Sequence, residues 1–233
     1  MTLKEIVQPT RKELFIKEIE RKILSGEWKV GDKLPTEREM EQKMKVSRTI
    51  INSGLSELAQ NGFVKIVPRK GVFVGDYTRN GQLNTLLSII NFNGGRFDKK
   101  TVDSLTAYRI HLDCECASLS AKNRTEEDLK IMKDIYVKIK STSEMDDIVK
   151  LKFDFLHAIY CSTGNNIYPL VCNAFKKVCI TFNEIMFTHF GCESHDYIKN
   201  LIDVIENHDS EAAHKIMYEF LTSRIDELNQ FYF

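Results

Sequence analysis

The sequence lacks several features that would point to a membrane or secreted protein. No apolar run approaches the length of about 20 residues that a membrane-spanning helix needs, and the N-terminal segment MTLKEIVQPTRKEL lacks the apolar core of a signal peptide. None of the six cysteines forms a CxxC pair, so we interpret them as reduced thiols rather than disulfides or zinc ligands. We therefore expect a cytoplasmic globular protein with no membrane association.

What the sequence does contain is a balanced composition with an uneven distribution of charge. Of its 233 residues, 42% are hydrophobic and 28% charged, which suits one large domain or two small ones. The overall net charge is zero, but residues 1–78 hold 15 Lys and Arg against 11 Asp and Glu, a net of +4, and the remaining residues carry −4. A basic first third joined to an acidic remainder suggests a polyanion-binding module attached to a second domain.

The first third shows the signals of three helices followed by two short strands. Apolar spacing predicts a helix over 9–24, and Thr36 and Glu39 form a capping box that opens a second helix. Ser47 is predicted to cap a third helix that ends near residue 60. The β-rich runs FVKIV and GVFVG then flank a turn and predict a hairpin. Three helices and a two-stranded ribbon are the plan of a winged helix-turn-helix.

The third predicted helix, which begins in the segment VSRTIINSGL, presents two different faces. Ile51, Leu55 and Leu58 occupy positions i, i+4 and i+7 and predict a buried stripe. In a helix-turn-helix, the opposite side of the N-terminal end enters the major groove, where arginine can bind guanine and asparagine can bind adenine. The polar residues expected on that side are Arg48, Thr49, Asn52 and Ser53.

Two further basic regions fit the same interpretation. Arg38 in the second helix is placed to bind a phosphate, and the hairpin tip VPRKG, with Arg69, Lys70 and Gly71, is placed to reach the minor groove. For an isolated helix, an ordinary solvated face is the simpler explanation of Arg48 and its neighbours. The hairpin that follows in the right order favours DNA binding instead.

The segment GDKLPTEREMEQKMKVSRTIINSGLSELAQNGFVKIVPRKGVFV resembles the N-terminal domain of GntR-family bacterial transcriptional regulators, with their LPSER…VSR…L..L…G…GtFV pattern. The resemblance runs from about Ile23 to Val74 and implies that Arg38, Arg48 and the wing-tip Gly71 contact DNA. The chain departs from the family where Asn52 replaces the usual arginine, which implies a different operator. It also has Gly54 in place of alanine, which we attribute to close crossing by the preceding helix.

The rest of the chain predicts a second domain that is entirely helical. We place the DNA-binding domain at 1–75, a linker at 76–82 and the helical domain at 83–233. The fold class is therefore mainly α, a winged helix-turn-helix with a small β-hairpin followed by an all-α bundle. Helices are predicted near 83–91, 101–121, 125–140, 145–162, 167–190, 196–207 and 210–230.

Three polar residues interrupt the apolar stripes of the predicted bundle: Arg109, His157 and His189. A buried arginine needs an anionic partner, which can be internal, such as Asp113 or Asp154, or a bound carboxylate. Each histidine taken alone is more often a hydrogen-bonded core residue than a ligand contact.

Three segments of this domain, at 108–121, 153–165 and 204–217, resemble the C-terminal ligand-binding domain of the FadR subfamily. Many members of that subfamily bind a divalent metal through one aspartate and three histidines. His157 matches one ligand position, but the others hold Phe153, Ile198 and Phe220. We therefore expect no metal or other cofactor, although a shifted site that uses His195 stays an alternative.

The sequence thus predicts a dimeric, ligand-responsive regulator, a repressor that binds a palindromic DNA operator. A small anionic metabolite is expected to bind at Arg109, Phe153, His157 and His189. The alternatives are a metal sensor that uses His157, His189 and His195, and an enzyme acting in the same pocket. Against an enzyme, the sequence offers no nucleophile–base pair, no glycine-rich phosphate loop and no complete metal set.

Overall fold

The computed structural model describes the backbone of residues 8–94, 99–190 and 195–231, with side chains in these ranges except at 189–190 and 224–231. The chain divides into two compact units, Met1–Gly95 and Arg96–Phe233. Among the described residues, no helix is long and apolar enough to cross a membrane.

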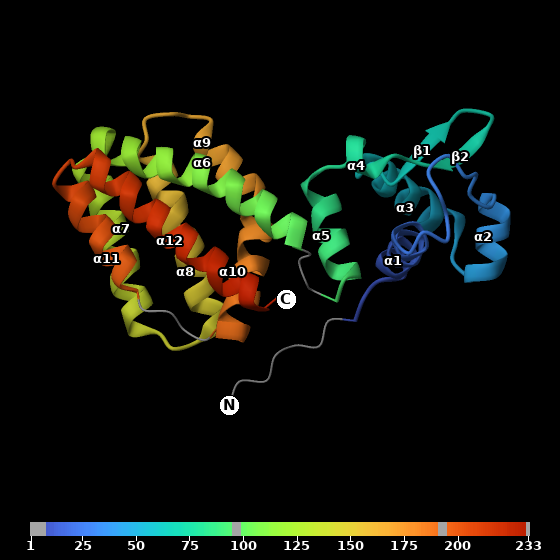
Figure 1. Cartoon of the computed structure of the whole chain (residues 1–233). Helices are drawn as coiled ribbons and strands as arrows, with labels where there is room; N and C mark the ends of the chain where they lie inside the picture. The colour runs from blue at the N-terminus through green and yellow to red at the C-terminus, as the bar shows by residue number, and fades with distance from the viewer. Residues whose placement is uncertain (1–7, 95–98, 191–194, 232–233) are drawn as a thin grey trace. The chain divides into compact units, whose positions relative to one another are not determined.

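The first unit is a winged helix-turn-helix, as predicted (Figure 1). Its strands pair antiparallel, with Val64 opposite Val74 and Val67 opposite Gly71. The wing is therefore a hairpin whose turn lies at residues 68–70. In chain order the elements are α1 (Arg11–Leu24), α2 (Glu37–Met44), α3 (Arg48–Gln60), β1 (Val64–Val67), β2 (Gly71–Val74), α4 (Tyr77–Asn80) and α5 (Leu83–Phe92).

Local capping and a small apolar core fix these helices. The capping box of Thr36 and Glu39 is confirmed, and Thr10 opens α1 in the same way. Ser47 occupies the N-cap position of α3 as predicted, but its side chain makes no capping hydrogen bond. Packing therefore holds α3 more than its cap does. The core consists of buried residues from the three helices and the wing, among them Phe15, Ile19, Ile51, Leu55, Leu58, Phe63 and Val74.

Gly54 lies where α3 packs closely against another helix. A Cβ added to it would lie 2.5 Å from Cδ1 of Phe15, whose ring is buried. The helix that crosses at Gly54 is therefore α1 and not the preceding α2, which corrects the sequence interpretation. The physical need for glycine is nevertheless the expected one, since no side chain fits between the two helices.

The segment after the wing stays attached to the first unit. The hydroxyl of Thr85 in α5 donates to the Asn61 carbonyl at 2.6 Å, and Ser88 donates to a carboxylate oxygen of Glu20 in α1 at 2.8 Å. The two compact units consequently divide near residue 95, whereas the sequence placed its linker at 76–82. That linker contains the short helix α4, and the functional boundary stays a prediction.

Among its described residues, the second unit contains helices and no strand, and its long helices α6 and α12 pack along each other (Figure 1). Its core cluster draws on α6, α7, α8, α9, α11 and α12. The elements are α6 (Lys99–Asn123), α7 (Glu126–Ser141), α8 (Met145–Cys161), α9 (Tyr168–Ala174), α10 (Lys176–Phe190), α11 (Asp196–Glu206) and α12 (Ser210–Phe231).

One predicted helix of this unit is divided in two. The single helix expected over 167–190 is interrupted at Phe175, whose amide donates to both the Val171 and Cys172 carbonyls. The Phe175 ring stacks on Tyr108 of α6, with ring centroids 4.5 Å apart. No glycine or proline marks the break in the sequence, so apolar periodicity alone predicted a continuous helix.

Candidate functional sites

The residues expected to contact bases lie together on one exposed surface of α3. Ile51, Leu55 and Leu58 are buried against the core, as the stripe predicted. The structure therefore brings the expected base-reading residues to one side of the N-terminal half of α3. All four of them are exposed: Arg48, Thr49, Asn52 and Ser53.

Arg48 is held by a carboxylate that the sequence interpretation did not identify. Its Nε donates to Oε2 of Glu41 in α2 at 3.1 Å, and both side chains are exposed, at 63% and 42%. This exposed ion pair links α2 to the first turn of α3, and water or DNA can compete for the guanidinium. The partners are seven positions apart on two different helices, so the spacing within one helix did not predict the pair.

The wing tip is basic and conformationally special. Arg69 and Lys70 are exposed, and Arg69 has a φ of 64°. Gly71 has a φ of 117°, a backbone conformation that favours glycine. This conformation explains the glycine without any contact to DNA. Lys33 pairs with Phe73 at the edge of the wing and adds a cation that the sequence interpretation missed.

Arg38 is exposed on the first turn of α2. It belongs to the same helix as Glu41, which contacts the base-reading helix α3. This placement suits a phosphate contact beside the groove that α3 would enter.

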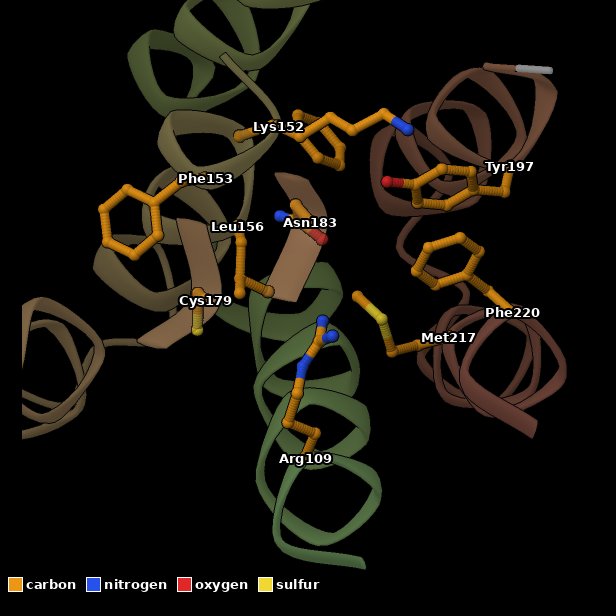
Figure 2. Close-up of a pocket in the computed structure, with 10 residues that line it drawn as sticks. Arg109, Lys152, Phe153, Leu156, Cys179, Asn183, Tyr197, Met217 and Phe220 are labelled. Carbon is orange, nitrogen blue, oxygen red and sulfur yellow. The ribbon is translucent and has the colours of Figure 1, made fainter. Parts of the chain in front are cut away.

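The second unit contains a small cavity of about 40 Å³ to which five helices contribute (Figure 2). The guanidinium of Arg109 extends from α6 toward Asn183 and Met217, and Lys152 extends along the opposite side toward Tyr197. Apolar side chains supply much of the wall. The lining residues are Arg109, Lys152, Phe153, Phe155, Leu156, Cys179, Asn183, Tyr197, Met217 and Phe220.

Arg109 has an internal partner, the first of the two that the sequence suggested. Its Nε donates to Oδ2 of Asp113 at 2.9 Å, and the two side chains are 15% and 2% exposed. The Tyr160 hydroxyl donates to the other oxygen, Oδ1, at 2.5 Å. Asp113 is therefore fixed from two sides and in turn fixes the guanidinium.

The electrostatics of this network follow from burial. Burial alone would lower the pKa of the Arg109 guanidinium, but the adjacent Asp113 carboxylate reverses the effect and the pKa is raised. Burial, and then the charge of Asp113, raise the pKa of Tyr160 far above its usual value, so its hydroxyl stays a donor. Burial likewise raises the pKa of Tyr197, which lines the cavity as a neutral phenol.

Phe153 lies in the wall of this cavity, as expected, but His157 does not. His157 lines a second cavity of about 320 Å³ between α7 and α8, near Cys161, whose sulfur lies 3.6 Å from its Nδ1. Phe153 and His157 are one turn apart on α8, but they line different cavities. The side chain of His189 lies outside the described residues.

A metal site finds no support among the described residues, where no group of three or more His, Cys, Asp or Glu side chains is arranged to hold an ion. Of the positions that carry ligands in the resembled subfamily, Phe153 and Phe220 belong to the wall of this cavity and Ile198 is buried in the core. None of these three side chains has an atom that coordinates a metal.

Sequence reasoning missed the remaining polar residues of the cavity, Lys152, Asn183 and Tyr197. Each lies on a different helix, α8, α10 and α11, and none breaks a predicted apolar stripe in the way Arg109 does. Their convergence on one cavity depends on how the helices pack, which local periodicity does not specify.

Each of the two units matches the model of a known protein family. Residues 13–74 match the family described as bacterial regulatory proteins, gntR family, and residues 104–223 match the FCD domain. The first match spans α1 through the wing, and the second begins in α6 and ends in α12.

Relatives and solved structures extend this likeness to most of the chain. The fatty acid metabolism regulator protein of Proteus mirabilis is 24% identical over 78% of this chain and 75% of its own length. That of Shewanella denitrificans is 28% identical over 69% of this chain, which spans 65% of the relative. A structure titled for Lar, which controls the Listeria monocytogenes agr system, covers 97% of this chain and 99% of its own, with a TM-score of 0.65 at 13% identity. At that identity it supports the fold alone.

Proposed function

We propose, from the premise that the chain belongs to the GntR family of bacterial regulatory proteins and carries a C-terminal FCD domain, that it is a dimeric repressor released from its operator by a small anionic metabolite. As a member of this family it is a DNA-binding transcription regulator and not an enzyme. The dimer, the operator, the sign of regulation and the effector are the proposed parts.

The observation that carries the DNA-binding mode is the exposed polar surface at the N-terminal half of α3. Arg48 and Asn52 are proposed to read base edges, with Thr49 and Ser53 beside them. Arg38 is proposed to bind phosphate, and the exposed Arg69 and Lys70 at the wing tip suit the minor groove or its backbone.

We propose a homodimer because two copies of this surface would read a longer DNA site than one copy can. One α3 helix reads only a few base pairs, and two copies related by a two-fold axis would place their α3 helices in successive major grooves of a palindrome. Repression is the simplest consequence, because a dimer covering a promoter excludes other proteins from it. We propose that this takes place in the cytoplasm, where the operator is.

The proposed effector site is the cavity at Arg109, with Phe153 in its wall. The names of the relatives from Proteus mirabilis and Shewanella denitrificans refer to fatty acid metabolism. Carboxylic acids are therefore the first candidates for the effector, and genes of carboxylic acid metabolism are the first candidates for regulation. His157 lines the other cavity and is therefore not part of the proposed effector site, and a role of His189 stays a prediction.

Selection from a random duplex library tests the proposal. Full-length protein at moderate salt should enrich a palindrome whose half-sites are about one helical turn apart. Adding small organic acids should then lower affinity for the enriched duplex; a tenfold decrease corresponds to about 1.4 kcal/mol of coupling. If the selected duplexes share no sequence, the DNA-binding mode is wrong, and if no acid changes affinity, the regulatory part is wrong.

A further inference from the structure

We infer that the cavity at Arg109 binds a short monocarboxylate with an apolar body, and that Asp113 and Tyr160 set this preference. The inference rests on the proposed function for what the ligand does, but the binding itself can be measured without DNA. Three features of the cavity carry it: the charge balance at Arg109, the fixed direction of its guanidinium, and the size and chemistry of the walls.

The charge balance at Arg109 favours a ligand with a single negative charge. Asp113 lies 2.9 Å from the Arg109 Nε and already compensates much of its charge. The arginine still offers N–H donors for one carboxylate. Its remaining positive charge is too small to stabilise a second carboxylate. Lys152, the other cation of the wall, already takes part in an interaction of its own.

The guanidinium direction is set by the buried network behind it. Asp113 accepts from the Nε of Arg109 on one oxygen and from the Tyr160 hydroxyl on the other. Because both of its oxygens accept hydrogen bonds, Asp113 is held beside the Nε of the guanidinium. The terminal nitrogens point toward Asn183 and Met217 in the cavity (Figure 2). Asp113 and Tyr160 are therefore positioning residues for a carboxylate that Arg109 would bind.

The size of the cavity limits the ligand to a few heavy atoms. Its volume is about 40 Å³. Since one water needs about 10–15 Å³ measured in this way, the cavity has room for roughly three water molecules. A carboxylate with a short carbon chain fills such a space, whereas a long acyl chain does not.

The walls disfavour a second charge. Phe153, Leu156, Met217 and Phe220 line the cavity with hydrocarbon, and the Phe220 ring stacks on Tyr197 with centroids 3.7 Å apart. A second carboxylate would lose its hydration against these side chains, and the neutral Asn183 and Tyr197 could offer it hydrogen bonds but no opposite charge. A dicarboxylate that bridges Arg109 and Lys152 is the competing ligand, and the experiment includes it.

Calorimetric titration of the full-length protein with propionate, succinate and octanoate tests the ligand class. Propionate should bind about tenfold more tightly than either competitor, a difference of about 1.4 kcal/mol. Tighter binding of succinate would overturn the charge argument, and tighter binding of octanoate would overturn the size argument. No measurable binding of any of the three acids would overturn the inference as a whole.

Variants of the network test the positioning role. Asp113→Asn keeps the shape but restores the full charge of Arg109, so the ratio of propionate to succinate affinity should fall about tenfold in favour of succinate. Tyr160→Phe releases one oxygen of Asp113 and should weaken propionate binding about fivefold while leaving the ratio near its original value. A purely structural network would lower the melting temperature in both variants without changing the ratio or the affinity, and that result would refute the role.

The two proposals fail in different ways. Binding of propionate that leaves operator affinity unchanged would refute the regulatory proposal and preserve the ligand class. Release of operator DNA by succinate or octanoate, with propionate inactive, would preserve the regulatory proposal and refute the ligand class.

Discussion

Each unit of this protein contains an arginine that a carboxylate holds by its Nε, and the two pairs differ in almost everything else. In the winged unit, Arg48 and Glu41 meet at 3.1 Å with side chains 63% and 42% exposed. In the helical unit, Arg109 and Asp113 meet at 2.9 Å with side chains 15% and 2% exposed. Similar bond lengths thus occur in an aqueous and a largely desolvated setting.

The difference teaches what each pair is able to do. An exposed pair contributes about 0–1 kcal/mol to stability, so Arg48 can exchange Glu41 for DNA at little cost. A buried pair is expensive to break, because removing one partner leaves the other charge without hydration or a counter-ion. Arg109 can therefore bind a ligand only in addition to Asp113, whereas Arg48 can bind DNA in place of Glu41.

The largest effect should follow from Arg109→Ala. The variant leaves Asp113 as an unpaired buried carboxylate, so the free energy of unfolding should fall by about 3–5 kcal/mol, measured by denaturant titration. Its operator affinity, measured below the melting temperature, should stay nearly unchanged, but organic acids should no longer alter it. If the acids still changed operator affinity in this variant, Arg109 would not be part of the ligand site.

A double variant separates stability from ligand response. Arg109→Met combined with Asp113→Leu replaces the pair by apolar side chains, which often restores or even raises stability. We expect a melting temperature near that of the original protein and still no response to acids. If the response returned together with stability, Arg109 would be only a structural partner.

Arg48→Ala should show the opposite profile. The free energy of unfolding should change by no more than about 0.5 kcal/mol because the pair with Glu41 is exposed. Affinity for the selected operator should fall by about 1–3 kcal/mol, with relaxed preference at one base position. Arg38→Ala is the matched control, since loss of a phosphate contact should weaken all duplexes alike in the same binding assay.

Gly54→Ala tests how tightly the winged unit is packed. The added methyl group would lie 2.5 Å from the buried ring of Phe15, and such overpacking costs about 1–3 kcal/mol. The gain in helix propensity of about 1 kcal/mol offsets part of this, so a net loss should appear in thermal unfolding. Ser53→Ala, on the exposed side of the same helix, should be nearly neutral, and equal stability of the two variants would contradict the close crossing.

The smallest effect should come from Glu20→Gln. Burial raises the pKa of Glu20, so its charged form is less favourable in the folded state than in the unfolded chain. The stability that the protonated form confers is complete below pH 4.5 and is lost as pH rises through the raised pKa of the folded state. Glutamine avoids this loss, so calorimetric melting temperatures should favour the variant at pH 7 and converge near pH 4.

The sequence was informative about the winged unit because its elements are local. Capping at Thr36, the apolar spacing of Ile51, Leu55 and Leu58, and a hairpin around three turn residues each act over a few neighbouring positions. Once the buried face of α3 was known, the exposed face followed from helical geometry alone. What the sequence did not disclose there was Glu41, because its contact with Arg48 spans two helices.

The helical unit shows the limit of the same reasoning. Sequence alone determined that the unit is a bundle of helices and that Arg109 needs an anionic partner, since a charge on an apolar stripe has to be compensated. Only the tertiary structure decided that Asp113 is this partner, that Tyr160 fixes it, and that Lys152 faces the same cavity while His157 faces another. The physical reason is that periodicity specifies which face of a helix is buried, whereas a cavity depends on how several such faces pack together.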